Sequence, residues 1–123
     1  MDFFDALNVH LAWKHRLRGY LEGTSGEELD PEVVARDDCC ELGRWIAAEG
    51  EAMAGLPEFI HMREQHAAFH RCAGDVVRCR QSGDVDGAEH LLVTEYAQVS
   101  ARVIRSITRL NRVLEEGRTH KAA

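Results

Sequence analysis

The sequence predicts an all-α protein, an antiparallel four-helix bundle with a short second helix and a long C-terminal helix. In four stretches of the chain, apolar residues recur three and four positions apart, which is the period of a helix with one buried face. No stretch alternates apolar and polar residues as a half-buried strand does. A length of 123 residues suits one core, so we expect residues 1–123 to form a single domain.

The first helix is predicted over residues 3–22, and the Gly-Thr-Ser-Gly turn at residues 23–26 ends it. Its inward stripe consists of Phe3, Leu7, His10, Leu17 and Leu21, with Phe4 and Leu11 beside it. His10 is therefore expected to point into the core from the middle of this helix.

The short second helix is predicted to follow a brief helical segment. Asp30, placed before a proline, starts that segment, which reaches about residue 36. Asp37 or Asp38 is then expected to cap the second helix, which begins near Cys40. Gly43 is unusual so early in a helix, and it predicts that another backbone or a ligand comes close. The apolar residues of this helix are Leu42, Trp45 and Ile46.

The third helix is predicted over residues 57–81, with Pro57 in its first turn. Its stripe consists of Phe59, Met62, His66, Phe69, Ala73, Val76 and Val77, with His70 adjacent. The last helix is predicted from about residue 86 to 117, where Asp86 and Glu89 resemble a capping box. Its seam consists of Leu92, Tyr96, Val99, Val103, Ile107, Leu110 and Leu114. A helix roughly 45 Å long exceeds what a small monomeric bundle needs, which suggests a partner subunit or a helical extension.

The composition excludes several classes of function. The formal net charge is -6, so we expect no nucleic-acid partner. No run approaches the roughly 18 apolar residues that a membrane span needs, and no signal peptide is recognisable. The four cysteines Cys39, Cys40, Cys72 and Cys79 are too few for a secreted disulfide scaffold. We therefore expect free thiols in a cytoplasmic protein.

His66 and His70 predict a metal site. Residues four apart share one face of a helix, with Cβ atoms roughly 5–6 Å apart. His10 can supply a third ligand from the first helix. Cys40 can supply the fourth, because the unpaired N–H groups at a helix start favour the thiolate. Three imidazoles and one thiolate suit tetrahedral Zn²⁺.

The stretch Cys40-Glu41-Leu42-Gly43-Arg44-Trp45 resembles the Cys-x-Leu-Gly-x-Trp signature of the chemoreceptor zinc-binding (CZB) domain family. A preceding helix histidine and a following His-x-x-x-His pair complete the similarity, which covers nearly the whole chain. The resemblance implies a three-histidine, one-cysteine zinc site at His10, Cys40, His66 and His70. It also implies a bacterial zinc-sensing module that forms homodimers and is attached to a chemoreceptor or a diguanylate cyclase. The chain carries no output domain, and we expect a free-standing member rather than an excised one.

Four protein ligands leave no coordination position for water or substrate, so we predict a regulatory or structural site and no enzyme. Ala67 also stands where a His-Glu-x-x-His protease needs glutamate. The expected role is to transmit zinc or oxidant status to a partner, since a zinc-bound Cys40 thiolate can be oxidised.

Two alternatives remain open. The chain can be a metal-free helical adaptor or dimerisation module, or an iron-binding bundle similar to hemerythrin. Glu58 and His61 form one Glu-x-x-His element, but ferritin-like sites need two. Cys39 is the rival of Cys40, because neighbours on a helix point about 100° apart and only one reaches a metal. The other histidines, expected at the surface, are His15, His61, His90 and His120.

Overall fold

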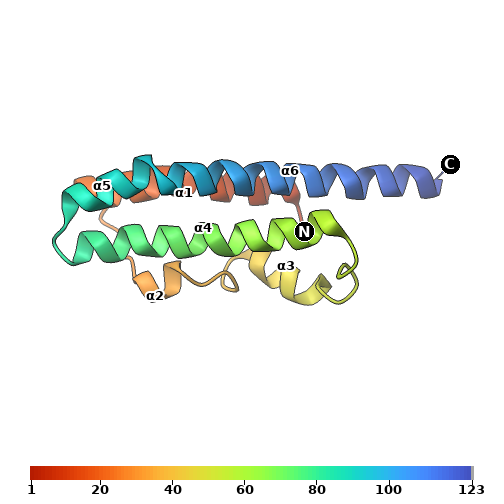
Figure 1. Cartoon of the computed structure of the whole chain (residues 1–123), viewed down its shortest axis with the longest axis horizontal. Coiled ribbons are helices and arrows are strands. Elements are labelled where there is room, and N and C mark those ends of the chain that lie inside the picture. Colours follow the sequence, from red (N-terminus) through yellow and green to blue (C-terminus); the bar gives the residue numbers. More distant parts are fainter. Residues whose placement is uncertain (123) are drawn as a thin grey trace.

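The structure is a computed structural model that describes the backbone of residues 1–122 and the side chains of residues 1–117. Within this part the chain is helical and has no strand, which confirms the all-α prediction. The helices are α1 (Phe3–Glu22), α2 (Pro31–Val34), α3 (Glu41–Glu49), α4 (Pro57–Gln81), α5 (Val85–Val93) and α6 (Glu95–Ala122). Helices α1 and α4 run in one direction and α3 and α6 in the other, as in an antiparallel bundle (Figure 1).

Helix α1 has the predicted bounds, and its ends show why. The Asp2 carboxylate accepts hydrogen bonds from the N–H groups of Phe4 and Asp5, which caps the first turn. At the other end Gly23 adopts φ 74°, a left-handed conformation that favours glycine.

The buried face of α1 is the predicted one at Phe3, His10, Leu17 and Leu21, and Leu7 is partly buried beside it. Its buried residues are Phe3, Ala6, His10, Trp13, Leu17 and Leu21. Trp13 and Ala6 complete the stripe because they lie three or four positions from His10. Phe4 and Leu11, expected beside the stripe, are instead 70% and 52% exposed.

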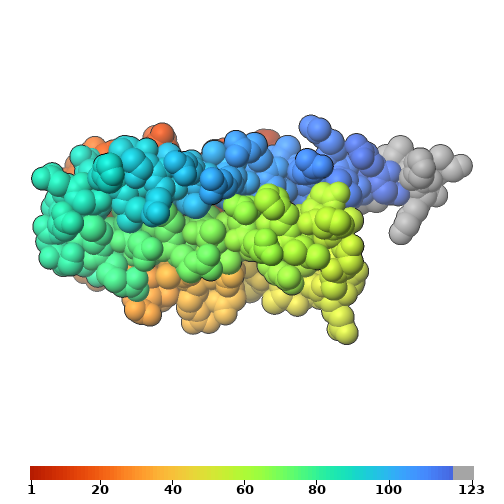
Figure 2. Space-filling view, viewed as in Figure 1, coloured from red at the N-terminus to blue at the C-terminus, as the bar shows by residue number. Residues whose placement is uncertain are grey.

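Helix α4 runs through the centre of the bundle and packs against α1, α2, α5 and α6. Phe59, Met62 and Phe69 are fully buried in its stripe, as predicted. The space-filling view shows α4 flanked by α6 on one side and by the α2 and α3 segments on the other (Figure 2). The buried face of α4 carries His66 and His70.

The predicted last helix is divided in two at Thr94. Thr94 has φ −111° and ψ −93°, outside the helical region, and its hydroxyl donates a 2.6 Å hydrogen bond to the carbonyl oxygen of His90. A Ser or Thr hydroxyl bound to a carbonyl four residues back competes with the helical ladder and bends a helix. The apolar seam predicted for the last helix is nevertheless buried on both sides of the break, at Leu92 and at Tyr96.

The start of α5 also differs from the prediction. The cap is Asp84, whose carboxylate accepts a 2.8 Å hydrogen bond from the Gly87 N–H, rather than the box formed by Asp86 and Glu89. A Cβ at Gly87 would lie 2.1 Å from that carboxylate, so a side chain there would displace the Asp84 cap. At its other end α6 passes residue 117 and runs beyond the other helices (Figure 1).

No helix among the described residues combines the length and apolar character needed to cross a lipid bilayer.

Candidate metal centre

The four residues singled out in the sequence lie together in the interior. The side-chain donor atoms of His10, Cys40, His66 and His70 are all within 4.8 Å of one another. They come from three elements: His10 from α1, Cys40 from the residue before α3, and the other two from α4. The three histidines are at most 4% exposed, and Cys40 is half-buried.

The distances fit a tetrahedral zinc site. The two Nε2 atoms of His66 and His70 are 3.1 Å apart, and Cys40 Sγ lies 3.2 Å from the first and 3.7 Å from the second. Ordinary Zn–N and Zn–S bond lengths give a tetrahedron with N···N edges of about 3.3 Å and N···S edges of about 3.6 Å. These three edges are close to those of a tetrahedral Zn²⁺ site, and the edges to His10 are within 4.8 Å.

Two backbone carbonyls orient the imidazole rings. His10 Nδ1 donates a 2.7 Å hydrogen bond to the carbonyl oxygen of Ala6, and His70 Nδ1 donates one of 3.0 Å to that of Val34. Because a carbonyl only accepts, each Nδ1 carries the proton and each Nε2 presents a lone pair to the cluster. Such outer hydrogen bonds are the usual support of metal-binding histidines.

His10 Nε2 provides the clearest sign of a missing partner. The atom is buried and makes no hydrogen bond to any described residue. Buried polar atoms are nearly always paired, because an unpaired one costs about 1–3 kcal/mol. A cation held by this lone pair removes the deficit, so the residues present fit a metal ion.

Burial keeps the three imidazoles neutral, which is the form that binds metal. Burial, with a smaller contribution from the neighbouring imidazoles, lowers the pKa of His10 to about 4 and that of His66 to about 3. The pKa of His70 is also lowered, mainly by burial. Burial raises the pKa of the Cys40 thiol, although the Gly43 N–H, 3.3 Å from Sγ, opposes the shift. A bound cation favours the thiolate, so metal binding releases this proton.

Cys40 itself is the N-cap of α3. The sequence predicted Asp37 or Asp38 for this role, and that prediction is wrong. The Cys40 sulfur accepts a hydrogen bond from the Gly43 N–H, which lies in the first turn of α3 and has no carbonyl partner within the helix. Gly43 makes the close approach that the sequence predicted. A Cβ there would lie 1.8 Å from the carbonyl oxygen of Asp37, so the preceding loop folds directly over the start of α3.

Sequence reasoning missed the groups that support the cluster. The carbonyl of Ala6 lies one helical turn before His10, and the carbonyl of Val34 belongs to α2, which ends at residue 34 rather than 36. Gly74 on α4 lets α2 approach, since a Cβ there would lie 2.7 Å from Ala35 Cβ and 3.0 Å from the Pro31 oxygen. A glycine inside a long helix was the available signal.

The other candidate residues lie elsewhere. Cys39 is exposed, with its sulfur 3.6 Å from the Asp38 carboxylate. Trp45 packs edge-on against Phe3 and Phe59, at ring distances of 5.1 and 6.0 Å, as a packing anchor. His15, His61 and His90 are exposed as expected, and His120 falls outside the described side chains.

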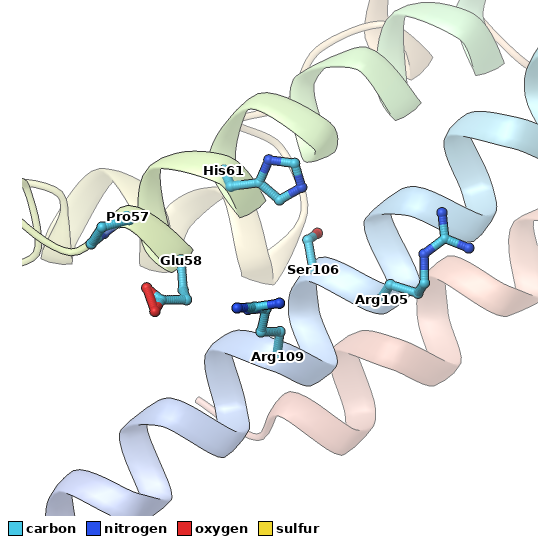
Figure 3. Close-up of a pocket in the computed structure, with 6 residues that line it drawn as sticks. All are labelled: Pro57, Glu58, His61, Arg105, Ser106 and Arg109. Carbon is cyan, nitrogen blue, oxygen red and sulfur yellow. The ribbon is translucent and has the colours of Figure 1, made fainter.

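The Glu-x-x-His element faces a separate surface pocket of about 430 Å³ between α4 and α6 (Figure 3). Glu58 and His61 share this pocket with Arg105, Ser106 and Arg109, and the Arg109 side chain extends toward Glu58. Two guanidinium groups oppose the binding of a cation. The geometry of this pocket therefore does not favour the iron-binding alternative.

A comparison with protein families matches residues 10–77 to the chemoreceptor zinc-binding domain, CZB. The match spans more than half of the chain and includes His10, Cys40, His66 and His70. Comparisons with curated proteins and with solved structures return no match. The geometry of the cluster and the family match agree, and the chain belongs to the chemoreceptor zinc-binding domain family, a family of sensory rather than catalytic domains.

Proposed function

We propose that this chain is a zinc-binding sensory domain of bacterial signalling, of the chemotaxis or cyclic-di-GMP type, and that it binds one Zn²⁺. The ligands are His10 Nε2, His66 Nε2, His70 Nε2 and Cys40 Sγ. The observation that carries the proposal is the convergence of these four donors within 4.8 Å, with two of the rings oriented by backbone carbonyls.

The donor set supports zinc over other metals. Imidazole and thiolate together in a tetrahedral arrangement are typical of Zn²⁺, which also has no redox chemistry of its own. Four protein ligands complete the coordination sphere and leave no place for substrate. The proposed site is therefore regulatory, and no catalytic role is assigned to it.

Transmission of the signal starts at α3. The proposed site joins α1, α3 and α4 at one point, and α3 is only nine residues long with Cys40 as its cap. Without zinc, Cys40 is no longer tied to the histidines of α1 and α4, and its neutral thiol is a weaker acceptor for the Gly43 N–H than a zinc-bound thiolate is. Loss of a cap destabilises a helix by typically ~1 kcal/mol, so α3 loosens first.

The middle of α3 and the segment after it connect this change to the long helix α6. Trp45 and Met53 line an apolar groove of about 560 Å³ together with Val113 and Leu114 of α6. Movement of Trp45 therefore alters the surface beside the projecting end of α6. We propose that a chemoreceptor or diguanylate cyclase, in the same chain or a separate one, senses this surface.

Two signals suit the site, zinc availability and oxidants. An oxidant converts the Cys40 thiolate to a sulfenic acid, a poorer ligand, and so releases the metal. The half-buried position of Cys40 supports this route, since a fully buried sulfur is protected from reagents. The proposed location is the cytoplasm, where a reducing environment keeps the thiol ready.

We also propose that the domain forms homodimers through α1 and α6. Phe4 and Leu11 are exposed two turns apart on one face of α1. Leu11 borders an apolar pocket of about 440 Å³ that Ala101 and Ile104 of α6 also line. A projecting aromatic ring beside an apolar hollow is self-complementary under two-fold symmetry.

The experiment that tests the proposed function measures metal in protein purified without a polyhistidine tag, for wild type and Cys40→Ala. We expect about one zinc per chain in wild type, and a sharp loss in the variant because three ligands remain. Cys72→Ala, which removes a thiol outside the cluster, is the matched control and keeps its zinc. Wild-type protein that takes up no zinc under reducing conditions would leave the metal-free adaptor as the better account.

A further inference from the structure

A surface groove leads to the metal cluster from one side. It has a volume of about 430 Å³, and we name it the access groove. Its walls include Trp13, Arg16, Val33, Arg36 and Cys39, and two cluster residues, Cys40 and His70, also line it. His10 and His66 are 1% exposed and do not line it. A small molecule in this groove therefore reaches the thiolate side of the cluster.

Cys39 places a second thiol in the same groove. It is exposed, whereas the neighbouring Cys40 is half-buried and belongs to the cluster. The Asp38 carboxylate, which lies 3.6 Å from the Cys39 sulfur, is itself held by two hydrogen bonds of 2.9 and 3.1 Å from Arg36. The sulfur is thus in an ordered position at the edge of the groove, and no contact of the metal cluster uses it.

A closed four-ligand zinc site exchanges its metal slowly unless an incoming ligand takes part, because zinc tolerates a fifth ligand more readily than the loss of one. The incoming ligand must approach from an open side, and the access groove is open beside Cys40 and His70. The groove also carries the carboxylates of Glu27, Glu28 and Asp30. Cys39 is its thiol outside the cluster, and a soft thiolate is the ligand type that zinc prefers.

We propose that the access groove is the route of zinc exchange and that Cys39 is a transient zinc ligand in it. The proposal rests on the proposed function, since it concerns the rate at which the same site is filled. On uptake, the Cys39 thiol gives its proton to the departing chelator and its sulfur bonds to zinc as a zinc–chelator bond breaks. The Cys40 thiol then passes its proton to the departing Cys39 sulfur as the zinc–Cys39 bond breaks and the zinc–Cys40 bond forms, and no electrons are transferred.

This role has a kinetic signature. A transient ligand speeds uptake and release by the same factor, so its removal slows both and leaves the dissociation constant unchanged. A resident ligand behaves differently, because its loss speeds release and weakens binding. The two roles are therefore separated by measuring both rates and the equilibrium.

The test is stopped-flow transfer of zinc from the reduced, zinc-loaded chain to pyridylazoresorcinol, together with uptake from the zinc complex of that chelator. We expect Cys39→Ser to slow both directions several-fold by the same factor. Cys79→Ser is the control, because that thiol lies in the last turn of α4 beside Asp84, outside the access groove. We expect it to exchange zinc at the wild-type rate.

A steric variant tests the route without changing any thiol. Val33 is 51% exposed on the wall of the groove, and Val33→Trp fills it. We expect several-fold slower exchange at unchanged affinity, while Val93→Trp, at an exposed valine outside the groove, has no effect.

Wild-type rates in both Cys39→Ser and Val33→Trp would overturn the proposed route while leaving the zinc site intact. Weaker equilibrium binding in Cys39→Ser would make Cys39 a resident ligand and also contradict the proposal. A wild-type chain that holds no zinc at all would instead remove the proposed function, and this inference with it.

Discussion

His70 Nδ1 donates a 3.0 Å hydrogen bond to the carbonyl oxygen of Val34, which joins the metal cluster to α2. The two residues are 36 positions apart, and the bond forms only because α2 packs closely on α4 at Gly74. The orientation of one proposed ligand thus depends on a four-residue helix that contributes no ligand itself.

We predict that Gly74→Ala weakens zinc binding. The new Cβ would lie 2.7 Å from Ala35 Cβ, so α2 must move away from α4 and the His70 bond to Val34 lengthens. Loss of such an outer hydrogen bond typically costs about 10–100-fold in metal affinity. Overpacking should also lower the free energy of unfolding by about 1–3 kcal/mol. Zinc competition titrations and urea unfolding measure the two effects.

Gly55→Ala is the matched control, because a Cβ there meets no atom within 4 Å. Wild-type zinc affinity in Gly74→Ala would show that the packing of α2 does not set the orientation of His70.

Zinc should stabilise the wild-type fold, and His66→Ala should abolish the effect. A ligand that binds only the folded chain, at a concentration of 100 times its dissociation constant, adds about 2.7 kcal/mol to the free energy of unfolding. This raises the melting temperature by roughly 10 °C. His61→Ala removes an exposed histidine of the same helix and should keep the full shift. Melting curves by circular dichroism, with and without zinc, decide the matter; equal shifts in the two variants would exclude His66 as a ligand.

The metal-free protein should lose stability as the pH falls below about 6.5. His10 and His66 have folded-state pKa values of about 4 and about 3, lower than the ordinary value of 6.5 in the unfolded chain. Between these limits the unfolded chain binds more protons, so the free energy of unfolding is greatest above pH 6.5 and declines toward pH 4. The expected loss at pH 5 is of order 2 kcal/mol for each histidine.

Urea unfolding of the chelator-treated protein at pH 7 and pH 5 measures this loss. His10→Gln should reduce the difference between the two pH values, whereas His15→Gln, at an exposed position, should leave it unchanged. A metal-free protein equally stable at both pH values would contradict the burial of neutral imidazoles.

Trp45, in the middle of α3, should report zinc removal by a change in its fluorescence. In Trp13→Phe protein it is the remaining tryptophan of the chain, and it packs against Phe3 and Phe59. If α3 loosens when its cap is released, the indole becomes more exposed and its emission shifts to longer wavelength. The same chelator treatment of Trp13→Phe/Cys40→Ala protein should produce no further shift. An unchanged emission on zinc removal from the first protein would rule out α3 as the route of the signal.

Leu11→Glu should convert the proposed homodimer to a monomer. The change puts a charge into the apolar face formed by α1 and α6, where Leu11 is 52% exposed. Val85→Glu alters an exposed valine at the start of α5 and should leave the oligomeric state unchanged. Light scattering after size-exclusion chromatography measures the mass. A wild-type chain that is already monomeric would refute the dimer without affecting the zinc site.

The sequence by itself determined the helical class and the bounds of α1 and α4, because helical spacing and strong end signals such as Gly23 and Pro57 are local properties. It also singled out His10, Cys40, His66 and His70, since their helical positions and the Cys-x-Leu-Gly-x-Trp stretch are readable along the chain. That their donor atoms lie within 4.8 Å of one another is a property of the fold.

Only the tertiary structure decided the remaining features. The exposure of Phe4 and Leu11 depends on how α1 packs against its neighbours. At Thr94 both the N–H and the hydroxyl bond to the His90 carbonyl oxygen, so the bend there depends on how α5 and α6 pack on α4. The bond between His70 and Val34 joins residues far apart in sequence, so no local pattern specifies it. Spacing along a helix predicts which face a side chain occupies, but packing between helices sets which atom it meets.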